Sequence, residues 1–209
     1  MTDLAWYLTR ATGIVAAVLM VWALLWGLLF SARATGKRPR PAWWLDLHNW
    51  LGGLSLVFVV VHILASWIES ADIGPVQILV PGTSAPDRWG ISWGVLATYL
   101  LTLTVLTTWP KRLSNRRWWR IIHLTSIAAS GFALAHAMMS GSDFGRLGYR
   151  LIVLFLSFLA FYGVFERLLS LVQQRRRAAA RAALRERKAL APASPGAPAG
   201  NDFTDDDHG

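Results

Sequence analysis

Cysteine is absent from the 209-residue sequence. Its absence excludes disulfides, thiolate metal sites and covalent attachment of a cofactor through a C-x-x-C-H motif. Charged side chains are also scarce, at 16% of the residues, whereas soluble domains carry roughly 25%. Hydrophobic residues account for 54% of the chain. A composition so poor in charge argues against a soluble domain.

The scarce charges leave long segments without any Asp, Glu, Lys or Arg. Because a helix rises 1.5 Å per residue, about 20 apolar residues cross the roughly 30 Å hydrocarbon core of a bilayer. A shorter run at residues 151–165 extends to 149–172 when Glu166 and Arg167 lie at the interface and Arg167 snorkels outward. The four long runs, of 22 residues each, are Ala11–Ala32, Leu47–Ile68, Trp89–Pro110 and Ile121–Ser142.

We therefore predict an all-α fold, an integral membrane helical bundle with five transmembrane helices over residues 1–172. Residues 173–190 are rich in Ala and Arg and are expected to form a basic cytoplasmic helix. Residues 191–209 are rich in Pro, Ala and Gly, then acidic, and are expected to be disordered. The N-terminal nine residues carry no positive charge, so we do not expect a cleaved signal peptide. The helices are predicted at about 4–31, 43–68, 89–109, 117–140 and 149–172.

The basic residues gather on one side of the predicted membrane. Of 21 Lys and Arg residues, 17 fall between the first and second runs, between the third and fourth, or after the fifth. Lys and Arg near helix ends mark the cytoplasmic side, which predicts an outer N-terminus, a cytoplasmic C-terminus and a multi-pass protein of the plasma membrane. No folded basic face accompanies this excess, so nucleic-acid binding is not expected. The basic tail is expected to contact anionic membrane lipid.

Four of the five histidines lie within two of the predicted spans. His48 and His62 are 14 residues apart in the second span, and His123 and His136 are 13 apart in the fourth. Since these spans cross the membrane in the same direction, the histidines form two pairs at two depths, about 20 Å apart along the helices. A lone intramembrane histidine is more often a helix–helix hydrogen bonder than a ligand, but two depth-matched pairs favour ligation.

Two facing imidazoles are what a six-coordinate haem iron needs, and a helix bundle accommodates the flat, apolar macrocycle. We predict two non-covalent b-type haems, and four further residues are candidates for contact with them. Gly52 and Gly131 let a macrocycle approach the backbone, although Gly52 equally suits close helix packing. Arg120 is a candidate partner of a propionate at the cytoplasmic level. Arg10 is a candidate partner of a propionate or electron acceptor at the outer level, and is equally explained as an interfacial anchor.

The 13-residue interval between His123 and His136 is a geometric difficulty. At about 100° per residue it places the two side chains roughly 220° apart around the helix, whereas 14 residues return to within about 40° of one face. We expect either a local distortion of this helix near Ser126, Ser130 and Gly131, or an approach of His136 to its cofactor from a different side.

These residues resemble the ferric reductase-like transmembrane domain family, which includes the membrane portions of NADPH oxidases and ferric reductases. The resemblance covers about residues 5–170 and is carried by four patterns. The resemblance implies two b-type haems and outward electron flow. It pairs His48 with His123 on the inner side and His62 with His136 on the outer side. The patterns are H-x13-H on one span, H-x12-H two spans later, TRATG around Arg10 and WWRIIHL ending beside His123.

The sequence departs from the full-length members of that family. No G-x-G-x-x-G motif follows a strand, so a flavin and nicotinamide domain is not expected after residue 172. Many members also have a sixth helix, for which there is no candidate here. Electrons are then expected from a separate cytoplasmic flavoprotein reductase or another donor, and they pass to an extracytoplasmic acceptor.

The leading hypothesis is therefore transmembrane electron transfer by an oxidoreductase component without its own flavin domain. A quinol-coupled cytochrome b subunit keeps the haems and changes the donor. A non-redox transporter or assembly protein, whose histidines bind metal or protons, is the third hypothesis.

Overall fold

The computed structural model describes residues 2–32, 43–69, 74–84, 87–108, 116–140 and 145–190. The disordered tail predicted for 191–209 and most of the basic residues of the two predicted cytoplasmic loops lie outside these ranges. The described helices are α1 (Thr2–Ala32), α2 (Trp43–Glu69), α3 (Pro75–Leu79), α4 (Arg88–Thr108), α5 (Arg116–Ser140) and α6 (Leu147–Leu190).

Five of the six helices are long and apolar enough to cross a membrane, α3 being the exception. The prediction of an all-α bundle with five spans is confirmed, and the chain is a multi-pass membrane protein. Which face each terminus occupies stays a prediction. Two units divide the chain, Met1–Ser170 and Leu171–Gly209, and α6 begins in the first and ends in the second.

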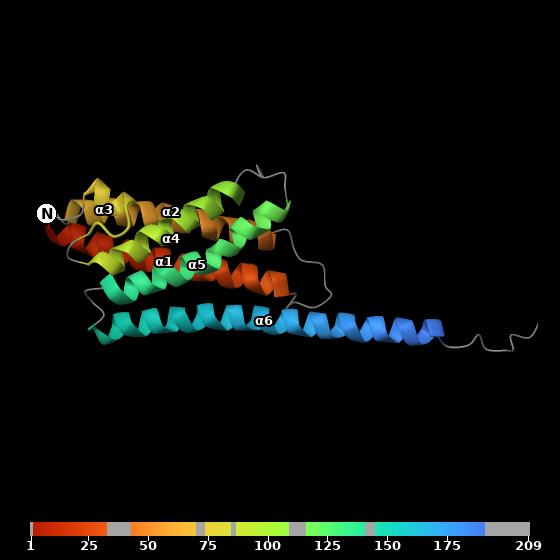
Figure 1. The fold of residues 1–209 in the computed structure, drawn as a ribbon. Helices are drawn as coiled ribbons and strands as arrows, with labels where there is room; N and C mark the ends of the chain where they lie inside the picture. Colours follow the sequence, from red (N-terminus) through yellow and green to blue (C-terminus); the bar gives the residue numbers. More distant parts are fainter. Residues whose placement is uncertain are drawn as a thin grey trace, which may run out of the picture. The chain divides into compact units, whose positions relative to one another are not determined.

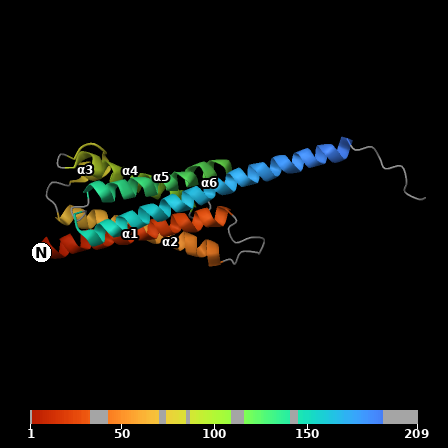
Figure 2. The same cartoon turned by 90° about the horizontal axis from the view of Figure 1, so that it is seen from below.

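The first unit is built from two antiparallel helix pairs. Helix α1 packs along α2, and α4 packs along α5 (Figures 1 and 2). Small side chains allow these helices to approach closely, as is usual where lipid replaces the hydrophobic effect between helices. Ala129 and Ser130 are only 1% exposed, and Ser55 is fully buried. The close approach places backbone carbonyls of one helix within reach of side chains of the next.

The first part of α6 packs on α1. Its Gly163 lies so near Leu25 and Leu28 that a methyl group there would meet both side chains. Arg167 donates a hydrogen bond to the Ser31 carbonyl at 2.9 Å, near the end of α1. Arg167, which we expected at the membrane interface, thus contacts the end of α1.

Two small apolar clusters form the centre of the first unit. Met20 and Val21 are buried neighbours on α1, and Met20 belongs to the first cluster whereas Val21 belongs to the second. Helix α1 therefore lies at the middle of the bundle. The first cluster is Ala16, Met20, Val59 and Leu101. The second is Val21, Leu25, Leu134 and Leu156.

The segment between α2 and α4 folds back onto α4. Tyr99 of α4 donates a hydrogen bond to the Leu79 carbonyl at the end of α3. Gly82 follows with a positive φ of 89°, a conformation that glycine adopts without strain, and its N–H donates to Ser92 Oγ at 2.7 Å. The connection between α2 and α4 thus contains a short apolar helix, α3, held against α4.

Candidate functional site

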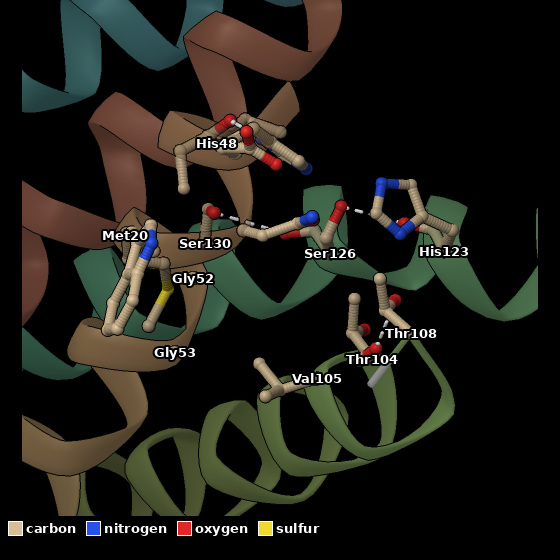
Figure 3. Close-up of a pocket in the computed structure, with 15 residues that line it drawn as sticks. Met20, His48, Gly52, Gly53, Thr104, Val105, Thr108, His123, Ser126 and Ser130 are labelled. Atoms are coloured by element: carbon tan, nitrogen blue, oxygen red, sulfur yellow. Dashed lines mark hydrogen bonds between the residues drawn. The ribbon is translucent and has the colours of Figure 1, made fainter. Parts of the chain in front are cut away.

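His48 and His123 face each other across α2 and α5. Their ring centroids are 5.7 Å apart, and both rings line a cavity of about 480 Å³, which we call the His48 cavity. Figure 3 shows His48 and His123 on different walls of this cavity, with Ser126 near His123. The remaining wall is mostly apolar or glycine backbone, which suits a flat apolar ligand.

His62 and His136 make a second pair on the same two helices. Their ring centroids are 6.1 Å apart, and they line another cavity of about 480 Å³, the His62 cavity. Its wall also includes charged and polar groups, among them Arg10, Glu69 and Asp87. The structure therefore brings together all four predicted histidines as two pairs, as the sequence predicted.

Three of the four imidazoles are oriented by a backbone carbonyl of a neighbouring helix. Because a carbonyl can only accept, the Nδ1 atom of each ring must carry the proton. This leaves the Nε2 lone pair free for a metal, the usual arrangement behind a ligating histidine. The three bonds are His48 to Ala23 at 3.0 Å, His62 to Thr9 at 2.8 Å and His136 to Gly90 at 2.8 Å.

Glycines lie directly behind the same three rings. A methyl group added to Gly13 would lie 3.0 Å from the His62 ring, and one on Gly27 would lie 3.0 Å from the His48 ring. Gly94 of α4 has the same relation to His136, also at 3.0 Å. Our sequence analysis missed these glycines. One signal was present, because Gly13 and Gly27 are 14 residues apart, the same interval as His48 and His62 on the antiparallel partner helix.

His123 is held differently from the other three. Its Nδ1 atom is buried and has no hydrogen-bond partner among the described residues. Instead, the ring of Trp119, one turn earlier on α5, stacks on the imidazole with centroids 4.9 Å apart and planes 16° apart. His123 therefore takes its support from its own helix.

His123 and His136 are held by different kinds of contact, and this difference bears on the 13-residue interval between them. Helix α5 is α-helical throughout Arg116–Ser140, with no interruption near Ser130 or Gly131. His136 reaches α4 and bonds to Gly90, whereas His123 stacks on Trp119. The two rings thus contact different neighbours besides their partner histidines, and how the 13-residue interval is accommodated stays a prediction.

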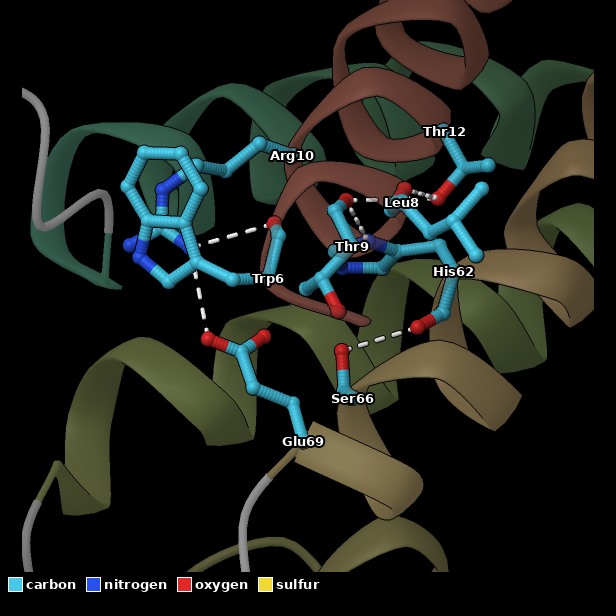
Figure 4. A network of polar contacts seen from close by, with 8 residues as sticks. All are labelled: Trp6, Leu8, Thr9, Arg10, Thr12, His62, Ser66 and Glu69. Carbon is cyan, nitrogen blue, oxygen red and sulfur yellow. Dashed lines mark hydrogen bonds and ion pairs between the residues drawn. The ribbon is translucent and has the colours of Figure 1, made fainter. Parts of the chain in front are cut away.

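Arg10 lies in the wall of the His62 cavity, where it is already paired. Its guanidinium lies 3.3 Å from Glu69 Oε1, and it also donates to the Trp6 carbonyl at 3.3 Å (Figure 4). The guanidinium stacks over the Trp6 ring, 3.7 Å from its centroid. Glu69 was not identified from the sequence as part of the site, because it ends a span and resembles an interfacial charge.

Of the other three residues that were predicted to contact a haem, one lines a cavity and two lie at the surface. Gly52 lines the His48 cavity, and a methyl group there would meet nothing within 4 Å, so its face is open to the cavity. Gly131 and Arg120 are exposed, and neither belongs to the wall of either cavity within the described residues. A direct role for these two residues at the cavities therefore has no support from their position.

In each pair, the distance between the two imidazole rings suits an iron atom bound between them. Metal–imidazole bonds of about 2 Å on both sides would separate the ring centroids by a little over ~6 Å, close to the observed 5.7 and 6.1 Å. Two imidazoles leave four equatorial positions to another donor. No group of three or more potential protein ligands is found in the described ranges. A macrocycle that brings its own four donors matches this set.

A sequence model described as the ferric reductase like transmembrane component matches residues 12–136, more than half of the chain. The chain belongs to this family. Searches of curated proteins and of solved structures returned no match. The ferric reductase-like match spans all four paired histidines and ends at His136. Membership indicates transmembrane electron transfer as the general function, a haem cofactor as typical of the family and a redox partner in general terms.

Proposed function

We propose that this protein carries electrons through two b-type haems from a cytoplasmic donor to an extracytoplasmic acceptor. The observation that supports it most is the pairing of imidazoles in two separate cavities at 5.7 and 6.1 Å. His48 and His123 would hold one haem, and His62 and His136 the other. Bound haems would supply the redox-active groups.

The protein's own residues fix the ligands and separate the two sites. Carbonyls of α1 and α4 hold three imidazoles as the Nδ1–H tautomer, so that Nε2 is presented to the cavity. Of the described residues, Met20 alone lines both cavities, and it is 6% exposed. Its buried thioether side chain therefore borders both sites.

The orientation follows from the basic residues. With the C-terminus in the cytoplasm, the His48 cavity lies near the cytoplasmic face and the His62 cavity near the outer face. Residues 1–172 then form the bis-haem bundle and 173–190 a basic cytoplasmic helix. Its exposed arginines, such as Arg175 and Arg181, would meet anionic lipid. A separate flavoprotein reductase would dock on the same face and deliver electrons to the cytoplasmic haem.

The decisive experiment is spectroscopy of the purified protein. We expect a b-type spectrum with about two haems per chain, and His48→Ala or His136→Ala should each remove one. Protein that remains colourless when haem is supplied during expression would contradict the proposal, and bound zinc or iron without haem would favour a non-redox role. Reduction by a quinol in the absence of any flavoprotein would retain the haems but replace the donor.

A further inference from the structure

The four candidate ligands are not equally supported. His48, His62 and His136 each combine a backbone carbonyl on Nδ1 with a glycine of a neighbouring helix behind the ring. A ring held this way cannot rotate without losing its hydrogen bond, and it cannot retreat without striking the facing helix. The orientation of these three imidazoles and their distance from the facing helix are therefore fixed.

His123 has neither of these supports. Its Nδ1 is without a hydrogen-bond partner in the described part of the chain, and Gly13, Gly27 and Gly94, which lie behind the other three rings, do not contact it. Rotation about its side-chain torsions would break no hydrogen bond. Apart from the facing His48 ring, the ring contact that restrains it is the stack on Trp119, whose planes are 16° apart. Trp119 is half-buried, four residues earlier on the same helix.

We propose that Trp119 is the positioning residue for His123, and that His123 is the exchangeable ligand of the two haem sites. The inference rests on the proposed function, since it concerns ligation at the His48 cavity. With the stack in place, His123 Nε2 is directed toward the partner histidine across the cavity. Without the stack, the imidazole is free to turn away, and the iron there keeps His48 as its protein ligand.

The test uses carbon monoxide, which binds ferrous haem only where an axial position is open. Wild-type protein with two bis-histidine haems should be six-coordinate and bind little of it. Trp119→Ala should bind carbon monoxide at about half of the total haem, since one site of two is affected, and weaken haem retention at that site about 10- to 100-fold. Trp119→Phe keeps an aromatic face on His123 and should restore the wild-type spectrum.

A matched control separates this effect from loss of a large side chain. The Trp93 ring of α4 packs at a tilt against Phe132, with centroids 4.9 Å apart, and Trp93 belongs to the wall of neither cavity. Trp93→Ala should therefore leave both haems six-coordinate. To assign the site, Trp119→Ala is combined with His62→Ala, which removes the other haem, so that carbon monoxide should then bind nearly all of the haem that remains.

The outcomes distinguish this inference from the proposed function. Wild-type protein with two six-coordinate haems, together with a Trp119→Ala variant that is equally inert to carbon monoxide, overturns the role of Trp119 and leaves the electron path intact. If Trp119→Ala does not accumulate, Trp119→Leu retains an apolar side chain without the aromatic face. A Trp119→Leu variant that does not bind carbon monoxide would equally overturn the role of Trp119. Wild-type protein without haem overturns both proposals together.

Discussion

A methyl group on Gly13 would lie 3.0 Å from the His62 imidazole, closer than such contacts normally come. We therefore expect Gly13→Ala to push the ring toward the cavity by a few tenths of an ångström and strain its bond to the Thr9 carbonyl. Haem affinity at the His62 cavity should fall about 10- to 100-fold. Haem per chain, measured as the pyridine complex after dilution, should drop from two toward one.

Gly131→Ala provides the control for that substitution. Gly131 is exposed on α5, and a methyl group there would meet nothing within 4 Å. Alanine is favoured over glycine in a helix by about 1 kcal/mol, so this variant should retain both haems and be at least as stable. Equal haem loss in the two variants would mean that the space behind His62 is not what matters.

The Arg10–Glu69 ion pair is expected to couple α1 to α2. Both side chains are about three-quarters buried, at 23% and 25% exposure, so removal of either leaves the other charge poorly solvated. In a double-mutant cycle with Arg10→Gln and Glu69→Gln, the double variant should lose less stability than the sum of the singles, by about 0.5–3 kcal/mol. Denaturant unfolding in detergent measures this coupling, and additive losses would show that the pair contributes nothing.

Met20 is expected to separate the two cavities by its bulk. Met20→Ala removes a buried side chain from the first apolar cluster and should cost about 2–5 kcal/mol of stability. It should also slow electron exchange between the two haems, followed by rapid mixing with a reductant. Met20→Leu conserves the volume and should cost less than about 1.5 kcal/mol, with exchange close to wild type. If electron exchange between the two haems is unchanged in Met20→Ala, then Met20 has no part in electron transfer between them.

The absence of cysteine makes the membrane orientation directly measurable, because any introduced thiol is the only one in the chain. Thr83 is exposed beside α3, on the predicted outer side, and Arg181 is exposed on α6, on the predicted cytoplasmic side. A membrane-impermeant maleimide should label Thr83→Cys in intact cells. Arg181→Cys should react only after permeabilisation, and the reverse pattern would invert the topology.

The fold was predictable because charge and length alone decide which segments span a bilayer. The four 22-residue runs required no knowledge of packing, and each lies largely within a helix of the structure. The pairing of histidines was also predictable, since residues at matched depths on parallel spans are brought level by helix geometry. His48 with His123 and His62 with His136 needed no further information.

The supports behind the ligands were not predictable in the same way. Which carbonyl meets an imidazole depends on the rotation and separation of helices, and these are set by small side chains that carry no chemical signal of their own. Gly52 and Gly131 were chosen for their nearness to the histidines in sequence. The glycines that touch histidine rings, Gly13, Gly27 and Gly94, belong to other helices.

The carbonyls and glycines that restrain three of the imidazoles come from the polypeptide itself. Because these supports are main-chain groups and glycines of α1 and α4, the direction of the three rings depends on how closely those helices pack, and a substitution that spreads the helices would disturb the histidine pairs without touching a histidine.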